Sequence, residues 1–136
     1  MRIDTATESA AFRVLVVDDH PANRLLAVTV FEALGCQVWT AVDGVEAIDI
    51  ANLMRFDLVL MDRHMPRCGG DRATRRIRAS RGLSSDAVIL AHSSDPPMGA
   101  EAALYDGVMD KPVQPGAAED AVWSTVARTY GALAVA

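Results

Sequence analysis

Short apolar runs alternate along this chain with longer stretches in which apolar residues recur at helical spacing. The run RVLVV at residues 13–17 predicts a buried strand, which ends at the acidic pair Asp18 and Asp19. A helix is predicted over residues 21–34, because apolar side chains recur every three residues and Gly35 follows as a stop. These side chains are Leu25, Val28, Phe31 and Leu34.

The same order of strand and helix repeats to the end of the chain. Further strands are predicted at residues 37–41, 58–61, 87–91 and 108–109. Further helices are predicted at residues 45–54 and 70–81, from Pro96 or Pro97 to before Gly107, and at residues 116–130. Alternation of this kind predicts a parallel sheet, and strands this apolar need helices on both faces. We therefore predict an α/β fold, a doubly wound five-stranded parallel sheet with five helices.

Length and composition favour one soluble domain. The chain has 136 residues, is 51% apolar and 23% charged, and carries a net charge of -5, so it can bury a core. We expect the domain at residues 13–131, a flexible N-terminal tail at residues 1–12 and a C-terminal tail at residues 132–136. Cys36 and Cys68 fit neither a disulfide framework nor a zinc site. No apolar run is long enough to span a membrane, so we expect a cytoplasmic protein.

Positive charge is concentrated in one stretch. Between Arg63 and Arg81 lie seven arginines against the single acid Asp71. Such a stretch can bind phosphates or an acidic partner, but most are solvated helix faces, and we favour that interpretation. Direct DNA binding is not expected.

Charged side chains follow three of the predicted strands, and an imidazole follows another. Asp18 and Asp19 end the first strand and Asp62 the third, while His92 and Ser93 end the fourth and Lys111 follows the fifth. The carboxyl ends of parallel strands share one edge, where ligands bind. Clustered carboxylates repel one another unless a cation neutralises them, and an all-oxygen cluster suits Mg²⁺ or Mn²⁺.

Lys111 is the only lysine in the chain, and its flexible ammonium suits contact with a phosphoryl group. Taken singly, Asp18 and Asp62 are better explained as helix caps and Lys111 as a solvent-facing side chain. Their placement at the same ends of three strands favours a site. Pro112 after Lys111 allows a cis peptide bond, which the sequence leaves open.

Three segments resemble the signatures of response-regulator receiver domains from two-component signalling. They are VLVVDD at residues 14–19, LVLMDRHMP at residues 58–66 and DKP at residues 110–112. AVDGVEAI at residues 41–48 and GGDRATRRIR at residues 69–78 are similar to receivers carried by hybrid kinases. The resemblance covers residues 13–130 and implies a flavodoxin-like receiver fold of five βα units.

The resemblance implies that Asp62 is the phosphoacceptor, which takes a phosphoryl group from a sensor histidine kinase or a histidine phosphotransfer protein. It implies that Lys111 contacts the phosphoryl group. It also implies that Mg²⁺ is held by the side chains of Asp19 and Asp62, by Asp18 through water and by the backbone carbonyl of His64. Such a protein is a signalling module that catalyses its own phosphorylation and slow autodephosphorylation.

The sequence departs from the family at the output step. Receivers usually have Thr or Ser at the end of the fourth strand and an aromatic residue in the fifth, where this chain has His92 and Val108. The number of residues between His92 and Gly107 suits a normal fourth helix. Compared with other receivers, we therefore expect the chain to be shortened after Gly107. Ser93 or Ser94 is a candidate replacement for the missing hydroxyl. We favour a hydrogen bond from His92 to a carbonyl over contact with a phosphoryl group.

Two functions from different classes follow. The first is a stand-alone phosphorylatable receiver that contacts a downstream protein through the face formed by the fourth helix, fifth strand and fifth helix. The alternative is a degenerate receiver that binds its partner independently of phosphorylation. His92 and Val108 favour the alternative, whereas the complete set of Asp18, Asp19, Asp62 and Lys111 favours the first. A phosphatase of the haloacid dehalogenase type is disfavoured, because it needs an aspartate where this chain has His64.

Overall fold

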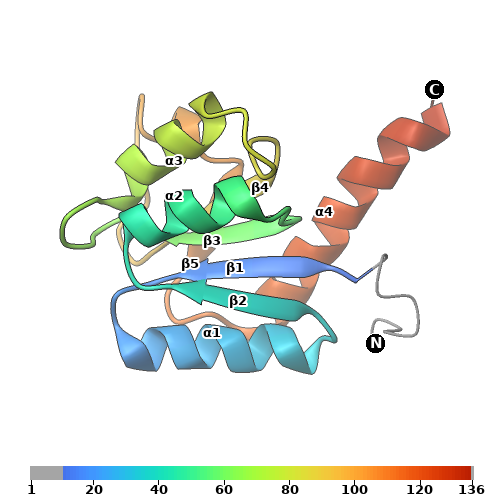
Figure 1. Cartoon of the computed structure of the whole chain (residues 1–136). Helices are drawn as coiled ribbons and strands as arrows, with labels where there is room; N and C mark the ends of the chain where they lie inside the picture. Colours follow the sequence, from blue (N-terminus) through green and yellow to red (C-terminus); the bar gives the residue numbers. More distant parts are fainter. Residues whose placement is uncertain (1–10, 136) are drawn as a thin grey trace.

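A single parallel sheet forms the centre of the computed structural model, which describes residues 11–135 (Figure 1). In this range the sheet has five strands in the order β2-β1-β3-β4-β5. The strands are β1 (Arg13–Val17), β2 (Gln37–Ala41), β3 (Leu58–Asp62), β4 (Val88–Ser93) and β5 (Gly107–Asp110). The order reverses between β1 and β3, as in other doubly wound folds. The predicted parallel α/β architecture is confirmed.

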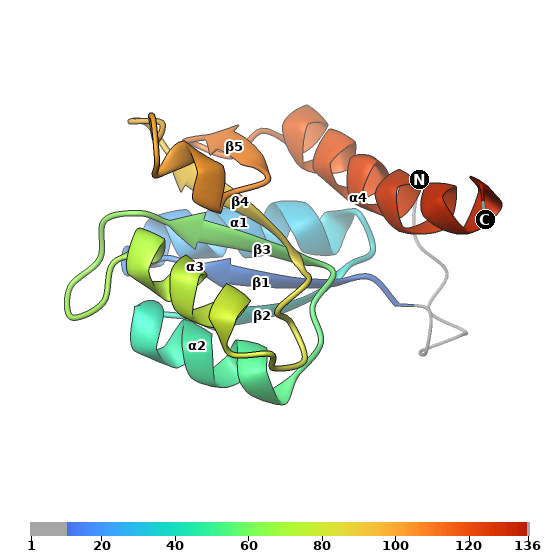
Figure 2. The same cartoon turned by 90° about the horizontal axis from the view of Figure 1, so that it is seen from above.

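Helices cover both faces of this sheet (Figures 1 and 2). One face packs against α1 (Pro21–Ala33) and α4 (Pro115–Val135), and the other packs against α2 (Gly44–Leu53) and α3 (Gly70–Ala79). Successive strand residues point to opposite faces, so each strand contributes to both cores. In β1, Val14 and Val16 pack on the α1 side and Leu15 and Val17 on the α2 side. This double burial explains why the strands are apolar throughout.

The predicted fourth of five helices is wrong. Residues 94–106, which connect β4 to β5, contain only one turn of 3₁₀-helix at Ala102–Leu104. The α-helices in the described range therefore number four. Pro96 and Pro97 lack an amide N–H, and Gly99 has a left-handed φ of 61°, which breaks any helix continuing from them.

The position of the shortened segment was also predicted wrongly. Gly107 is the first residue of β5 and pairs with Leu90, so the strand is complete between Gly107 and Lys111. What the β4–β5 connection before Gly107 has in place of the predicted helix is a single 3₁₀ turn at Ala102–Leu104. Periodicity could not locate this, because the pairing of β5 with β4 is a long-range contact.

Both ends of the domain also differ from the prediction. Ala11 and Phe12, which we placed in a flexible tail, are buried, and the Phe12 carbonyl accepts a hydrogen bond from Gln37 N. Residues 1–10 of that predicted tail lie outside the described residues. The last helix continues past the predicted end at Tyr130 to Val135, so most of the predicted C-terminal tail is helical.

Candidate functional site

Three aspartates and one lysine meet at the carboxyl edge of the sheet. In Figure 1 the strands end at this edge on the left. Asp18 and Asp19 follow β1, Asp62 is the last residue of β3, and Lys111 follows β5. One carboxylate oxygen from each aspartate lies within 4.8 Å of the others. Asp18 and Asp62 are buried, whereas Asp19 is exposed. The predicted convergence of these side chains is therefore present in the structure.

Lys111 connects the two buried carboxylates. Its Nζ lies 3.2 Å from Asp18 Oδ2 and 3.1 Å from Asp62 Oδ1. Burial by itself would lower the pKa of Lys111, but the hydrogen bond to Asp62 and the charges of both aspartates raise this pKa above its ordinary value. Lys111 is therefore cationic at neutral pH. The peptide bond between Lys111 and Pro112 is cis.

Neither buried aspartate caps a helix. The N-cap of α1 is His20 and that of α3 is Gly69, so the capping interpretation is wrong for both carboxylates. Asp18 Oδ1 instead accepts a hydrogen bond of 2.8 Å from His20 N. Asp62 Oδ1 accepts one of 3.3 Å from His64 N. These bonds fix the carboxylates at the mouth of the sheet rather than at helix termini.

Gly70 holds the loop after β3 tightly against the site. A Cβ atom at Gly70 would lie 2.1 Å from the Asp62 carbonyl oxygen, so the first turn of α3 can approach this strand end only with glycine. Cys68, which belongs to the same loop after β3, is buried against Gly44 of α2, as expected for a small core residue.

The electrostatics of the cluster favour a bound cation. Burial raises the pKa of Asp62, Lys111 lowers it through a hydrogen bond, and the nearby Asp18 carboxylate raises it further, with a net upward shift. One lysine faces two buried carboxylates and one exposed carboxylate, which leaves an excess of negative charge. Carboxylate oxygens are the donors that hard divalent cations prefer, so these residues fit such an ion.

His92 lies in the wall of this site and does not make the predicted bond to a carbonyl. It pairs in register with Asp62 on β3 and with Met109 on β5. The residue is 2% exposed, and neither ring nitrogen has a hydrogen-bond partner among the described residues. Burial and then the Lys111 charge lower the pKa of His92 to about 4, so the ring is neutral at pH 7.

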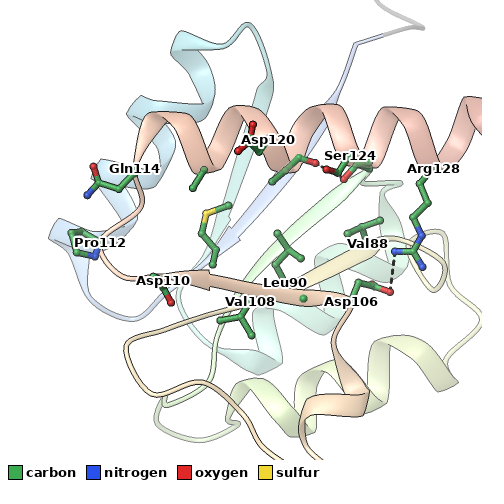
Figure 3. Close-up of a pocket in the computed structure, with 15 residues that line it drawn as sticks. Val88, Leu90, Asp106, Val108, Asp110, Pro112, Gln114, Asp120, Ser124 and Arg128 are labelled. Carbon is green, nitrogen blue, oxygen red and sulfur yellow. Dashed lines mark hydrogen bonds and ion pairs between the residues drawn. The ribbon is translucent and has the colours of Figure 1, made fainter.

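The other two positions predicted for the switch lie apart from the carboxylates. Ser93 Oγ donates to Asp95 O at 2.7 Å and accepts from Asp95 N at 2.9 Å, so its hydroxyl is used within its own loop. Ser94 is exposed. Val108 is 45% exposed and points away from α4 (Figure 3), on the side of β5 where the predicted fourth helix is missing.

A polar network that the sequence did not predict lies behind the site. Arg63, the residue after Asp62, donates to both carboxylate oxygens of Asp71 at 3.2 and 3.1 Å. Tyr105 Oη donates to the same carboxylate at 2.6 Å. Arg63 also donates to the Asp95 carbonyl at 3.0 Å. The Arg63–Asp71–Tyr105 network thus joins the end of β3 and α3 to the β4–β5 connection, and only the tertiary structure brings these residues together.

A groove of about 480 Å³ runs between β5 and α4 (Figure 3). Leu90 and Ala121 contribute apolar surface to it, and the ion pair between Asp106 and Arg128 lies at one end. Burial alone would raise the pKa of Asp106, but hydrogen bonds from Ile89 N and Arg78 hold it below its ordinary value. The contact face expected from the fourth helix, fifth strand and fifth helix therefore consists of β5 and α4 without the fourth helix.

The arginine-rich stretch is mostly a solvated helix face, as favoured. Five of its seven arginines are exposed, namely Arg67, Arg72, Arg75, Arg76 and Arg81. Three of the seven form ion pairs: Arg63 bonds Asp71, Arg78 pairs with Asp106 at 2.6 Å, and the exposed Arg67 pairs with the buried Asp43. Within the described range, no helix has the length and apolar character needed to cross a bilayer.

The family described as response regulator receiver domain matches residues 14–122. The chain belongs to this family. A receiver from two-component signalling accounts for the doubly wound sheet and for the acidic cluster with its lysine.

Among curated proteins, the receiver is similar to part of the sensor histidine kinase RcsC of Salmonella typhimurium, with 45% identity over 74 residues. That match covers 54% of this chain but only 8% of the kinase, so the chain spans less than a tenth of this relative.

Two solved structures share the fold. A CheY-like receiver domain from Methylobacillus flagellatus has a TM-score of 0.78 and 24% identity, covering 85% of this chain and 99% of that one. Response regulator TrrA of Thermotoga maritima, in complex with Mg(2+)-BeF, has a TM-score of 0.76 and 26% identity. This match covers 84% of the chain and 98% of TrrA.

Proposed function

We propose that this receiver accepts a phosphoryl group on Asp62 and passes the signal on by protein contact. The observation that carries the proposal is the bridge from Lys111 to the buried carboxylates of Asp62 and Asp18, at 3.1 and 3.2 Å. Keeping two carboxylates buried side by side costs stability, and a phosphorylation site is the function that best accounts for this arrangement in a receiver.

In the proposed reaction, a carboxylate oxygen of Asp62 attacks the phosphorus of a phosphohistidine on the donor protein. The new O–P bond makes an acyl phosphate, while the P–N bond breaks and its electron pair stays with the donor imidazole. Lys111 Nζ already lies beside Asp62 Oδ1, so it is placed to attract the phosphoryl oxygens.

The proposed metal site consists of Asp18, Asp19 and Asp62 with the backbone carbonyl of His64, and Mg²⁺ or Mn²⁺ suits these oxygen donors. When bound, such a cation supplies positive charge that offsets the phosphoryl oxygens during transfer. The backbone N–H groups of His20 and His64 donate hydrogen bonds to the carboxylates of Asp18 and Asp62, and these bonds fix the orientation of both carboxylates.

The proposed donor is a sensor histidine kinase or a histidine phosphotransfer protein, since the curated relative is a sensor histidine kinase. We propose that the receiver domain comprises the predicted residues 13–131 together with the buried Ala11 and Phe12, and that the groove between β5 and α4 is its contact surface for a downstream protein. The alternative of a degenerate, phosphorylation-independent module is not favoured, because the four charged residues of the site are all present and close together.

Incubation with acetyl phosphate and Mg²⁺, followed by intact-mass spectrometry, tests the proposal. We expect a Mg²⁺-dependent gain of one phosphoryl group in the wild type and none in Asp62→Asn. The matched control is Asp110→Asn, which changes an exposed aspartate at the end of β5 outside the carboxylate cluster and should be labelled like the wild type. Labelling that persists in Asp62→Asn would show that another residue is the acceptor.

A further inference from the structure

His92 occupies a place from which it faces the same space as the Asp62 carboxylate. β4 lies between β3 and β5, and the pairing sets His92 opposite Asp62 on one side and Met109 on the other. Residues paired in register on neighbouring parallel strands project to the same face of the sheet. Met109 belongs to the core on the α1 side, so the imidazole of His92 also lies on that face, level with Asp62.

The imidazole is buried without the hydrogen bonds that a buried ring requires. It is 2% exposed, and both Nδ1 and Nε2 lack partners among the described residues. A neutral imidazole always carries one N–H donor, and burying that donor unsatisfied is costly. Leu90, two residues earlier on the same strand, shows that an apolar side chain suits this face of β4. A role in filling space therefore does not account for a histidine at position 92.

The charged residues near the ring also place His92 at the carboxylate site. Lys111 and Asp18 both lie close enough to act on His92 electrostatically, so the ring borders the carboxylate site rather than a separate part of the core. An imidazole N–H can donate a directed hydrogen bond to an anionic oxygen held at this site.

We propose that the imidazole N–H of His92 donates a hydrogen bond to the phosphoryl group carried by Asp62. This inference rests on the proposed function, since it needs a phosphoryl group at Asp62. His92 then acts beside Lys111 as a second contact for the phosphoryl oxygens, and one ring nitrogen gains the partner that it lacks in the unmodified protein.

The test uses beryllofluoride with Mg²⁺ as a phosphoryl mimic and follows the ring nitrogens by NMR in protein labelled with ¹⁵N-histidine. We expect the His92 ring N–H to appear as a slowly exchanging signal when beryllofluoride and Mg²⁺ are present together, but not with Mg²⁺ alone. The variant His92→Gln identifies which of the three histidines gives the signal. Asp62→Asn should show no change in any histidine.

Affinity measurements provide a second readout. His92→Leu should weaken beryllofluoride binding by about tenfold, the size expected for loss of one hydrogen bond to a charged group. His92→Gln keeps an N–H donor and should retain most of the affinity, while Mg²⁺ affinity should stay within about twofold of wild type in both variants. Equal beryllofluoride affinity in the wild type and His92→Leu would overturn the assignment.

The outcomes also separate this inference from the proposed function. Beryllofluoride binding to the wild type without a new His92 signal would refute the histidine contact and leave Asp62 as the acceptor. A wild type that neither binds beryllofluoride nor gains a phosphoryl group from acetyl phosphate would refute both proposals.

Discussion

The two halves of the sheet are stabilised in different ways. Around β2, β1 and β3, helices pack on both faces, and the strand residues Leu15, Val59 and Leu60 are completely buried. Beside β4 and β5, a mostly irregular connection replaces one helix, and Val108 is 45% exposed. In this second half, polar contacts of Tyr105 and Asp106 hold the chain in place of helix packing.

This difference separates the proposed phosphoacceptor, Asp62, from the proposed contact surface between β5 and α4. Asp18 and Asp62 extend from strands in the tightly packed half, where a fixed geometry favours phosphoryl transfer. The β4–β5 connection depends on a few hydrogen bonds, one of which comes from Arg63, the neighbour of Asp62. Tyr105, near the end of this connection, is buried in the core on the α3 side and also anchors it.

The largest expected effect comes from a comparison of two valine-to-alanine substitutions, one in each half, each of which removes two methyl groups. Val59→Ala on β3 should lower the free energy of unfolding by about 2–3 kcal/mol, because Val59 is completely buried and a cavity would remain. Val108→Ala on β5 should cost less than about 0.5 kcal/mol, since its side chain is already exposed. Urea unfolding followed by circular dichroism measures both. Equal losses would mean that the β5 face is covered in solution.

A smaller effect is expected from adding a methyl group at a glycine in each half. In Gly70→Ala the new Cβ would meet the Asp62 carbonyl oxygen, which should cost about 2 kcal/mol and slow phosphorylation by acetyl phosphate. Gly116→Ala in the first turn of α4 meets no atom within 4 Å and should stabilise the protein by about 0.5 kcal/mol. Thermal unfolding gives the order of the two variants, and a stabilising Gly70→Ala would contradict the tight approach of α3 to β3.

The smallest effect is expected from removing the hydroxyl group of Tyr105. Tyr105→Phe should cost about 1 kcal/mol at pH 7, because the Asp71 carboxylate loses a hydrogen-bond donor. Burial alone would raise the pKa of Asp71, but hydrogen bonds from Arg63 and Tyr105 hold this pKa below its ordinary value. A lowered pKa stabilises the fold above the ordinary value, and this stabilisation is lost as the pH falls through the folded-state pKa.

The difference between wild type and Tyr105→Phe should therefore be full above about pH 5 and shrink below about pH 4. Unfolding curves in urea between pH 3 and pH 7 test this dependence. A difference that grows with acid would mean that the hydroxyl does not act through Asp71. Thr125→Val provides a control, since it removes a hydroxyl that bonds only within α4 and should show no such dependence on pH.

Much of the packed half was predictable from local patterns. The boundaries of β1 and β2 agree with the apolar runs, because a short β-branched run between turn residues specifies a buried strand on its own. The convergence of Asp18, Asp62 and Lys111 was predictable as well, since the carboxyl ends of parallel strands always share one edge. The helix predicted in the β4–β5 connection is wrong, because Pro96, Pro97 and Gly99 disfavour a helix there and the long-range contacts of Tyr105 and Asp106 hold the chain instead.

The sequence alone determined the fold class, the order of the strands along the chain and the residues of the acidic cluster. These depend on the alternation of apolar and polar residues and on the side chains that end each strand, which are local properties. Only the tertiary structure decided that Arg63 and Tyr105 share Asp71. Only it decided, within residues 11–135, that the predicted fourth helix is absent and that the His92 nitrogens have no partner. Each of these features depends on which residues from distant segments become neighbours in space. The local pattern of apolar and polar residues does not specify those contacts.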